Sequence, residues 1–176
     1  CSSLRSIVLP NSIVTIDDYA FANCTALSLI NIPSKVTIIQ DYTFGNCSSL
    51  TEITLPDSII CIAESAFAEC VSLTSIVIPE GVTNIEYEAF IDCKSLKNIT
   101  IPKSVTSLDG NIFDGTQWLD DQQDGPIYIN NCFYKYKGEM PIDFHIDIKE
   151  GTTCICDYAF YQCKNLKTIT LPNSLE

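Results

Sequence analysis

Ten cysteines are the residues of this 176-residue chain that could most readily do chemistry. Thiols at fixed spacing can form disulfides, bind metal ions or act as a reactive pair. Five of them follow one another at steps of 23 residues, and a sixth takes the same position after a break: Cys1, Cys24, Cys47, Cys70, Cys93 and Cys163. Side chains that recur in this way stack in parallel about 4.8 Å apart, whereas a disulfide holds its Cβ atoms about 3.8 Å apart. We therefore expect buried free thiols that pack as small hydrophobic side chains.

Four further cysteines lie outside that recurrence: Cys61, Cys132, Cys154 and Cys156. The C-I-C spacing at 154–156 places two thiols on one face of an extended segment. A zinc site needs about four ligands, and only Cys132 and His145 are other candidates nearby, so no metal site is expected. We expect free, outward-facing thiols at these positions, and the alternative is a disulfide from Cys132 to Cys154 or Cys156.

His145 is the single histidine, and its rarity removes most histidine-dependent catalysis. The period-two pattern around it places His145 and Asp147 side by side on an outward strand face. There they form either a pH-sensitive contact or an ordinary solvated surface. The carboxylates recur at turn positions, and the chain has neither a Gly-rich phosphate loop nor a G-x-S-x-G motif. We therefore expect no catalytic residues, no cofactor and no enzyme activity.

The elements that position these residues follow the same 23-residue period. Proline recurs at Pro10, Pro33, Pro56, Pro79, Pro102 and Pro172, and phenylalanine recurs at Phe21, Phe44, Phe67, Phe90 and Phe113. Each unit carries an alternating strand that ends at the proline, a polar turn, a second short extended segment and a brief corner. One such unit cannot bury its apolar face alone. The sequence therefore predicts a solenoid with rungs about 4.8 Å apart.

Composition excludes several classes of partner. Apolar residues make up 46% of the chain and charged residues 18%, with a net charge of -12. An acidic surface repels phosphate backbones, so nucleic acid is not an expected partner. No stretch approaches the roughly 20 apolar residues that span a bilayer.

The pattern L-x-x-I-x-[IL]-P-x-x-[VI]-x-x-I-x-x-x-[AT]-F-x-x-C, present over residues 1–115 and 140–176, resembles the BspA-like (Treponema pallidum type) leucine-rich repeat. The resemblance implies a leucine-rich-repeat solenoid of the repeat α/β class: a curved parallel sheet of short strands, with short second strands and 3-10 or helical turns on the other side. It also implies an extracellular or cell-surface protein that binds or adheres rather than catalyses.

The period fails at residues 116–139, which occupy 24 positions. P-I-Y-I-N-N-C-F-Y-K-Y at 126–136 predicts a β-hairpin that turns at Asn130-Asn131. Its aromatic residues, with the preceding tryptophan, form either a protrusion that grips a ligand or a plug that buries the rings: Trp118, Tyr128, Phe133, Tyr134 and Tyr136. We expect one solenoid domain over 1–176, with regular repeats at 1–115, this insertion, and repeats resuming at 140–176.

The outward strand positions are the generic ligand face of such a solenoid. They hold mostly small, uncharged residues and include Glu52, Thr54, Ser75, Val77, Asn98, Thr100, His145 and Asp147. A broad face of this kind suits a protein or glycan ligand better than a small molecule. The alternative is a structural spacer with no ligand. Because no polar capping repeat is visible, we also expect a fragment of a longer array that associates end to end.

Overall fold

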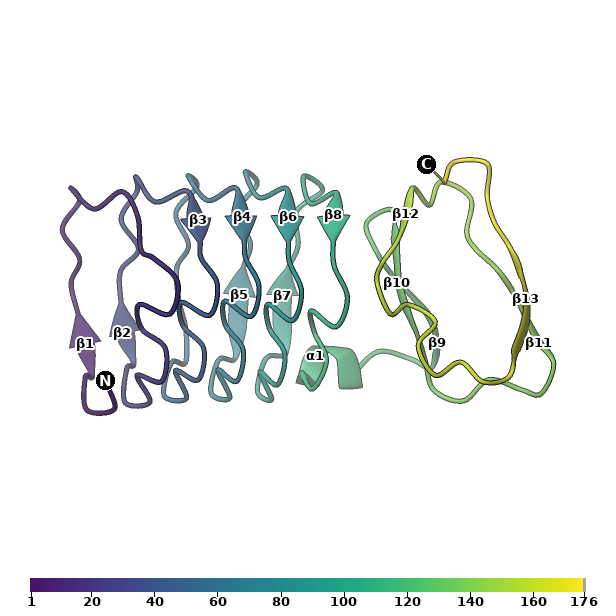
Figure 1. Cartoon of the computed structure of the whole chain (residues 1–176), viewed down its shortest axis with the longest axis horizontal. Coiled ribbons are helices and arrows are strands. Elements are labelled where there is room, and N and C mark those ends of the chain that lie inside the picture. Colours follow the sequence, from purple (N-terminus) through teal and green to yellow (C-terminus); the bar gives the residue numbers. More distant parts are fainter. Residues whose placement is uncertain (176) are drawn as a thin grey trace. The chain divides into compact units, whose positions relative to one another are not determined.

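The computed structural model describes residues 1–175 and divides the chain into two compact units, Cys1–Asp121 and Gln122–Glu176 (Figure 1). Unit 1 is a parallel β-solenoid in which each 23-residue repeat forms one rung. Its outward face carries β1 (Ser6–Ile7), β2 (Leu29–Ile30), β5 (Ser75–Val77) and β7 (Asn98–Thr100). Its second face carries β3 (Ile38–Ile39), β4 (Cys61–Ile62), β6 (Asn84–Ile85) and β8 (Ser107–Leu108).

Strand pairing in unit 1 keeps the register that the sequence period predicts. On the second face the strands follow the order β3-β4-β6-β8, and on the outward face β1 pairs with β2 and β5 with β7. Ser75, for example, lies opposite Asn98, and Cys61 lies opposite Asn84. The predicted leucine-rich-repeat solenoid with parallel strands is therefore confirmed.

A column of stacked phenylalanine rings runs through the core of unit 1. Phe44, Phe67 and Phe90 are fully buried, and neighbouring ring centroids lie 5.3 Å apart. Phe21 and Phe113 extend the column at 5.7 Å. Because each ring packs on the ring one rung away, the repeats bury together the apolar surface that no single repeat can cover.

The corners that carry these rings are turns rather than helices. Each corner holds two residues with positive φ, such as Tyr42 at 52° and Asn46 at 57°, and a right-handed helix cannot continue through them. The corner backbones bond from rung to rung instead: the Phe44 amide donates to the Ala66 carbonyl at 2.9 Å. Within residues 1–175 the only helix is α1 (Gln117–Asp120). The expected 3-10 or helical turns are thus wrong in detail, because left-handed residues interrupt every corner.

Helix α1 begins where the sequence period fails. Thr116 caps it, with a hydroxyl that accepts a hydrogen bond from the Leu119 amide at 3.2 Å and donates one to the Phe113 carbonyl at 2.6 Å. A threonine N-cap satisfies an amide that the first turn of a helix leaves unpaired. Among the described residues, no helix is long and apolar enough to cross a bilayer.

Unit 2 is built around the predicted hairpin. Strands β9 (Gly125–Ile129) and β10 (Cys132–Lys137) pair antiparallel around Asn130-Asn131, and β10 also pairs in parallel with β12 (Cys154–Ile155). The outward strands β11 (Phe144–Asp147) and β13 (Leu166–Thr170) form a second parallel pair. Phe133, Ile146, Ile148 and Ala159 make up a buried cluster of this unit. Strand β10 therefore takes the place that a second-face strand has in a regular rung.

Candidate functional site

The outward face of unit 1 carries six of the predicted ligand-face residues. All six side chains are exposed, and they come from three consecutive rungs: Glu52, Thr54, Ser75, Val77, Asn98 and Thr100. The residues between them, such as Ile53 and Ile76, point into the core. The alternation predicted from the sequence is therefore confirmed, while contact with a ligand stays a prediction.

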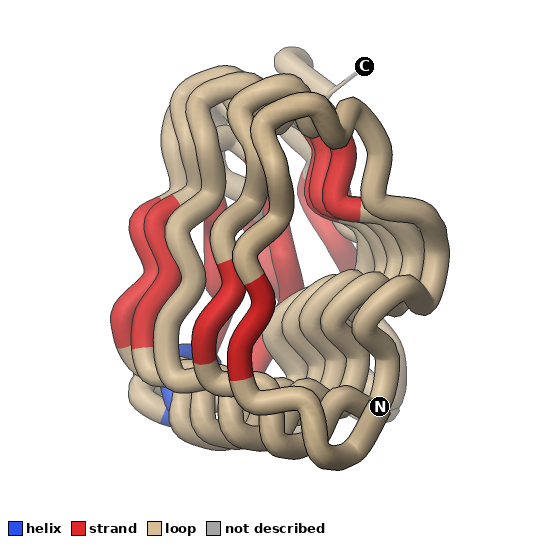
Figure 2. The backbone as a smooth tube through the Cα atoms, turned by 90° about the vertical axis from the view of Figure 1, so that its left-hand side faces the viewer, coloured by secondary structure: helices blue, strands red, loops and turns tan. Residues whose placement is uncertain are grey.

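One rung of this face differs from its neighbours. Residues Glu52–Leu55, which we call the open segment, form no strand and lie between the β1-β2 pair and the β5-β7 pair (Figure 2). Among the described residues, none of their backbone groups makes a hydrogen bond to another backbone group. On the second face of the same rung, by contrast, β4 pairs on both sides. The open segment therefore offers free amide and carbonyl groups in the middle of the face.

Two crevices of about 300 Å³ each flank the open segment. One lies against Leu29 and Asn31 of the preceding rung, and the other against Ser75 and Val77 of the following rung. Val77 is 65% exposed and Leu29 is 61% exposed. The face therefore combines unpaired backbone polar groups with apolar side chains on both sides, an arrangement that can hold a ligand bearing amides or hydroxyls.

Asn31 shows how an amide group pairs with an exposed backbone on this face. Its side chain accepts a hydrogen bond from the Leu9 amide at 2.8 Å and donates one to the Leu9 carbonyl at 3.0 Å. Within residues 1–175, no side chain pairs with the open segment in this way. A ligand amide could therefore pair with it as the Asn31 side chain pairs with Leu9.

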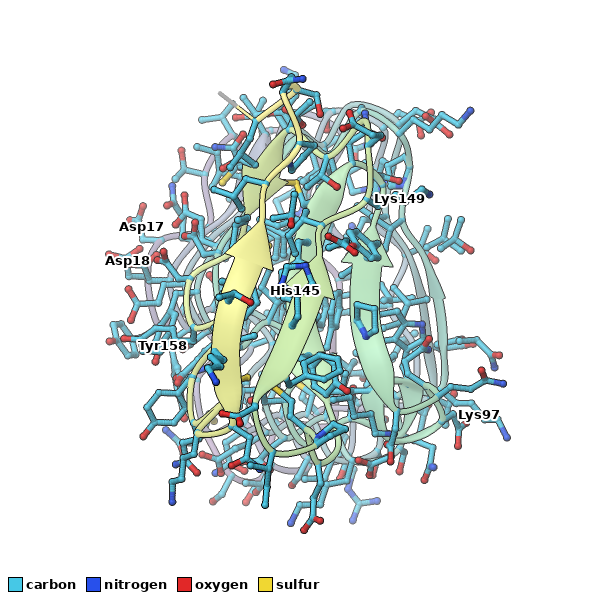
Figure 3. The ribbon with its side chains drawn as sticks, turned by 90° about the vertical axis from the view of Figure 1, so that its right-hand side faces the viewer. Asp17, Asp18, Lys97, His145, Lys149 and Tyr158 are labelled. Carbon is cyan, nitrogen blue, oxygen red and sulfur yellow. A yellow bond between two sulfur atoms is a disulfide. The ribbon has the colours of Figure 1, made fainter. Side chains whose placement is uncertain are left out.

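In unit 2 the outward face carries a hydrogen-bonded network around His145 on β11 (Figure 3). The His145 Nε2 lies 2.9 Å from Asp147 Oδ1 and 3.1 Å from Thr170 Oγ1, and Nδ1 lies 2.7 Å from Thr168 Oγ1. Because a carboxylate only accepts, Nε2 carries the proton that faces Asp147. The hydrogen bond from His145 holds the pKa of Asp147 below its usual value of 3.8. The network ties β11 to β13 and presents exposed polar groups.

The five predicted aromatic residues do not form a protrusion. Phe133 and Tyr134 are buried, and the other three rings are half-buried. Trp118 packs against Phe113 at 4.8 Å, and Tyr128 meets Phe133 edge-on at 5.3 Å. Of the two alternatives, the structure therefore favours buried rings over an exposed aromatic grip: β10 pairs with both β9 and β12, and Phe133 and Tyr136 pack in the core of unit 2.

The recurring cysteines are free thiols, and four of them are buried: Cys24, Cys47, Cys70 and Cys93. Each of the last three thiols donates a hydrogen bond to a phenylalanine carbonyl, a contact that the sequence did not predict. Cys70 Sγ, for example, lies 3.1 Å from the Phe44 oxygen. Burial raises the pKa of Cys47 to about 12. These thiols are therefore structural, as predicted, and unsuited to nucleophilic chemistry.

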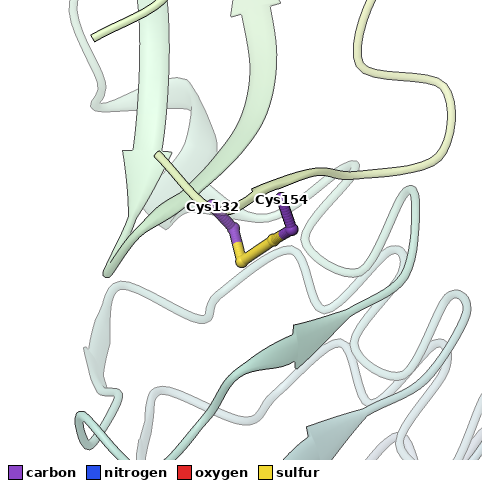
Figure 4. The surroundings of a disulfide bond; sticks show 2 residues. All are labelled: Cys132 and Cys154. Atoms are coloured by element: carbon purple, nitrogen blue, oxygen red, sulfur yellow. A yellow bond between two sulfur atoms is a disulfide. The ribbon is translucent and has the colours of Figure 1, made fainter. Parts of the chain in front are cut away.

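The expectation of free outward thiols is wrong at three of the remaining four positions. Cys132 and Cys154 form a disulfide (Figure 4), and Cys156 is buried. The two bonded residues are register partners in β10 and β12, with their Cα atoms 4.7 Å apart. This separation lies within the disulfide range of about 4.4–6.8 Å, so rung spacing alone does not prevent a bond. Cys61 stays free, and its thiol donates to Glu86 at 3.3 Å.

Residues 1–175 contain no cluster of three or more His, Cys, Asp or Glu side chains that could hold a metal ion.

A family profile described as the BspA type leucine-rich repeat region matches residues 1–120 and 128–176, in six copies. Among curated proteins, none matches this chain.

Solved structures of leucine-rich repeat proteins share this architecture. One from T. pallidum is 27% identical with a TM-score of 0.65, over 96% of this chain and 70% of that one. A leucine-rich cell surface protein from Faecalibacterium prausnitzii A2-165 is 30% identical with a TM-score of 0.60, over 98% of this chain and 40% of that one. One from Eubacterium ventriosum ATCC 27560, at 21% identity and a TM-score of 0.64, shares the fold over 98% of this chain and 49% of its own length. The chain thus spans less than half of the last two proteins.

Proposed function

This chain belongs to the BspA-type leucine-rich repeat family, and from that membership we propose that it is a non-enzymatic binding module, surface-exposed or secreted, that recognises a protein or glycan. The observation that carries the proposal is the open segment Glu52–Leu55 on the outward face of unit 1, with a crevice on each side. In a continuous sheet, the backbone amide and carbonyl groups of this segment would hydrogen-bond to the neighbouring strands. Here they stay free for a partner.

Two further observations support a location outside the cytoplasm. The Cys132–Cys154 disulfide is a bond that forms and persists in oxidising compartments. In addition, the relative from F. prausnitzii, 30% identical to this chain, is described as a cell surface protein. Both fit a module that meets its ligand in the extracellular medium.

The type of ligand follows from the surface chemistry. The face is broad, acidic at Glu52 and Asp57, and apolar at Leu29 and Val77. A protein segment or glycan satisfies free backbone groups over such an area, while each crevice of about 300 Å³ is at the lower limit of small-molecule sites.

The test is binding of the full chain to a panel of matrix proteins and immobilised glycans, repeated with the double variant Glu52→Gln/Asn98→Ala. We expect saturable binding that the double variant weakens at least tenfold, equivalent to about 1.4 kcal/mol. Glu64→Gln is the matched control, because Glu64 is also exposed but lies at a corner away from this face. If no panel member binds above background, the chain is a spacer and the proposal fails.

A further inference from the structure

A polar cleft of about 480 Å³ opens on unit 2, between the end of β10 and the corner of the following rung. Its walls include Tyr136 and Glu139 on one side, and Tyr161, Cys163 and Lys164 on the other. None of these residues belongs to the outward face on which the proposed function rests. The cleft therefore needs a separate explanation.

The cleft exists because the hairpin replaces a corner. In unit 1 the corner at 64–68 receives three hydrogen bonds from the amides of the preceding rung, at 2.7–2.9 Å. In unit 2, β10 continues as a strand to Lys137, with a register shift between Phe133 and Lys135, and at the equivalent corner, 157–161, the Tyr136 amide donates to the Ala159 carbonyl at 3.2 Å. Among the described residues, nothing donates to the Tyr161 carbonyl. An acceptor on the cleft wall is thus left without a partner.

Tyr161 also departs from the repeat in its side chain. The residue that follows the corner phenylalanine is small in most of unit 1, as Ala22, Gly45 and Ala68 show. In unit 2 the same position carries a tyrosine that is 68% exposed. A large ring at a position that three of the five unit 1 repeats fill with alanine or glycine provides a flat surface at the edge of the cleft.

Two charged side chains complete the lining. Glu139 and Lys164 are both exposed, and within residues 1–175 neither side chain makes a hydrogen bond or an ion pair. The cleft therefore presents a free carboxylate, a free ammonium group and an unpaired carbonyl, together with the exposed Tyr161 ring. Such a set offers both acceptors and donors to a ligand rich in hydroxyl groups.

We propose that this cleft binds a neutral disaccharide unit of a glycan. The apolar C–H face of a sugar ring packs on the Tyr161 ring, sugar hydroxyls donate to the Tyr161 carbonyl and the Glu139 carboxylate, and Lys164 donates to a sugar oxygen. A volume of about 480 Å³ lies within the range of small-ligand sites. The net charge of -12 disfavours anionic glycans.

This saccharide site stands independently of the outward face of unit 1. Loss of ligand binding by Glu52→Gln/Asn98→Ala would leave the cleft unaffected, because its lining lies wholly within residues 136–165. Conversely, if the cleft does not bind sugars, the proposal for the outward face still stands. The two proposals therefore fail separately.

The experiment is a titration of the isotope-labelled full chain with lactose, maltose, cellobiose and N,N′-diacetylchitobiose, followed by backbone amide NMR. We expect saturable shifts at Gln162 and Lys164 with at least one probe, and a dissociation constant on the order of 1 mM, as befits an open polar site. The same probe should slow alkylation of Cys163, which lines the cleft, and leave that of the exposed Cys1 unchanged.

The decisive variant is Tyr161→Ala, which should weaken binding roughly tenfold. It restores the residue that Ala22 and Ala68 supply in unit 1, so the fold should survive. Tyr19→Asn is the matched control, because Tyr19 is an exposed tyrosine (63%) in unit 1 and asparagine tolerates its φ of 58°. Glu139→Gln, which keeps the shape of the side chain, provides a second reduction in affinity.

Three results would overturn the proposal. They are an absence of cleft shifts with all four disaccharides, binding that Tyr161→Ala leaves unchanged, and binding of anionic sialyllactose alone. The dispersion of the amide spectrum shows whether the Tyr161→Ala variant is folded.

Discussion

The substitution Phe67→Ala tests the packing that holds unit 1 together. Phe67 is fully buried and stacks on Phe44 and Phe90, each at a centroid distance of 5.3 Å. Truncating a buried phenylalanine costs about 3–5 kcal/mol, and each stacked pair contributes about 0.5–1.5 kcal/mol beyond the area that it buries. Because the truncation cost already includes such contacts and Phe67 loses two stacked pairs, we expect Phe67→Ala to lower the free energy of unfolding by about 4–5 kcal/mol, the upper end of that range.

The matched comparison is Phe21→Ala at the first ring of the column. Phe21 is only half-buried and stacks on a single neighbour, Phe44, at 5.7 Å. Its truncation should cost about 2 kcal/mol, since it loses one ring contact and leaves a cavity that solvent can enter.

Urea denaturation monitored by circular dichroism measures both costs. Repeats couple mainly to their neighbours, so the solenoid can unfold in parts. A lower m-value for Phe67→Ala would show that it does. The loss in free energy of unfolding would then be measured by amide exchange. Equal losses for the two variants, or a loss below about 2 kcal/mol for Phe67→Ala, would refute the argument that the ring column carries the core.

Three other predictions concern single groups. The buried Cys47 thiol, with its pKa raised to about 12, should resist iodoacetamide in the native chain at about pH 8 and react after unfolding in urea; equal rates would show that it is accessible. Removing the disulfide with Cys132→Ser/Cys154→Ser should lower the free energy of unfolding by about 3 kcal/mol, the chain-entropy value for a 22-residue separation, and no loss would argue against the bond. The Asp147 carboxyl should titrate below 3.8 by NMR, so its stabilising contribution is complete above that pH and is lost as the pH falls further. His145→Gln should move that midpoint back toward 3.8, and an unchanged midpoint would contradict the assignment.

The regular part of the fold could be predicted because each repeat carries residues that fix its strand register. Proline at the end of the strand and phenylalanine at the corner recur every 23 residues, and strand partners such as Ser75 and Asn98 lie at that same separation. The outward exposure of Glu52 and Thr54 follows from the same count. A period that fixes register also fixes which side chains face solvent.

The disulfide could not be assigned because the recurring residues that fix the register are missing around it. Residues 116–139 hold one position more than the period, so counting back from Cys163 does not say whether Cys132 lies opposite Cys154 or Cys156. The hairpin settles this: Cys132 pairs with Cys154 at a separation of 22 residues. The aromatic rings of β10 were undecidable for the same reason, since their orientation depends on pairing with β12.

The open segment has no signal in the sequence. Residues 51–56, T-E-I-T-L-P, fit the repeat as well as the strand that becomes β5. Whether a short strand bonds to its neighbours depends on how adjacent rungs tilt, and this depends on packing over the whole rung rather than on local residue type. Such a feature is visible only in the structure.

Amide hydrogen exchange at Ile53, Thr54 and Leu55, measured with and without the ligand recovered from the binding panel, tests whether the open segment is unpaired in the free chain and is the binding site. We expect these amides to exchange fast in the free chain, much faster than that of Ile78, which donates to the Thr100 carbonyl at 3.0 Å, and to become protected when ligand is bound. Slow exchange in the free chain would mean that the ladder is continuous there. Unchanged exchange in the complex would mean that the outward face at Glu52–Leu55 is not where the ligand binds.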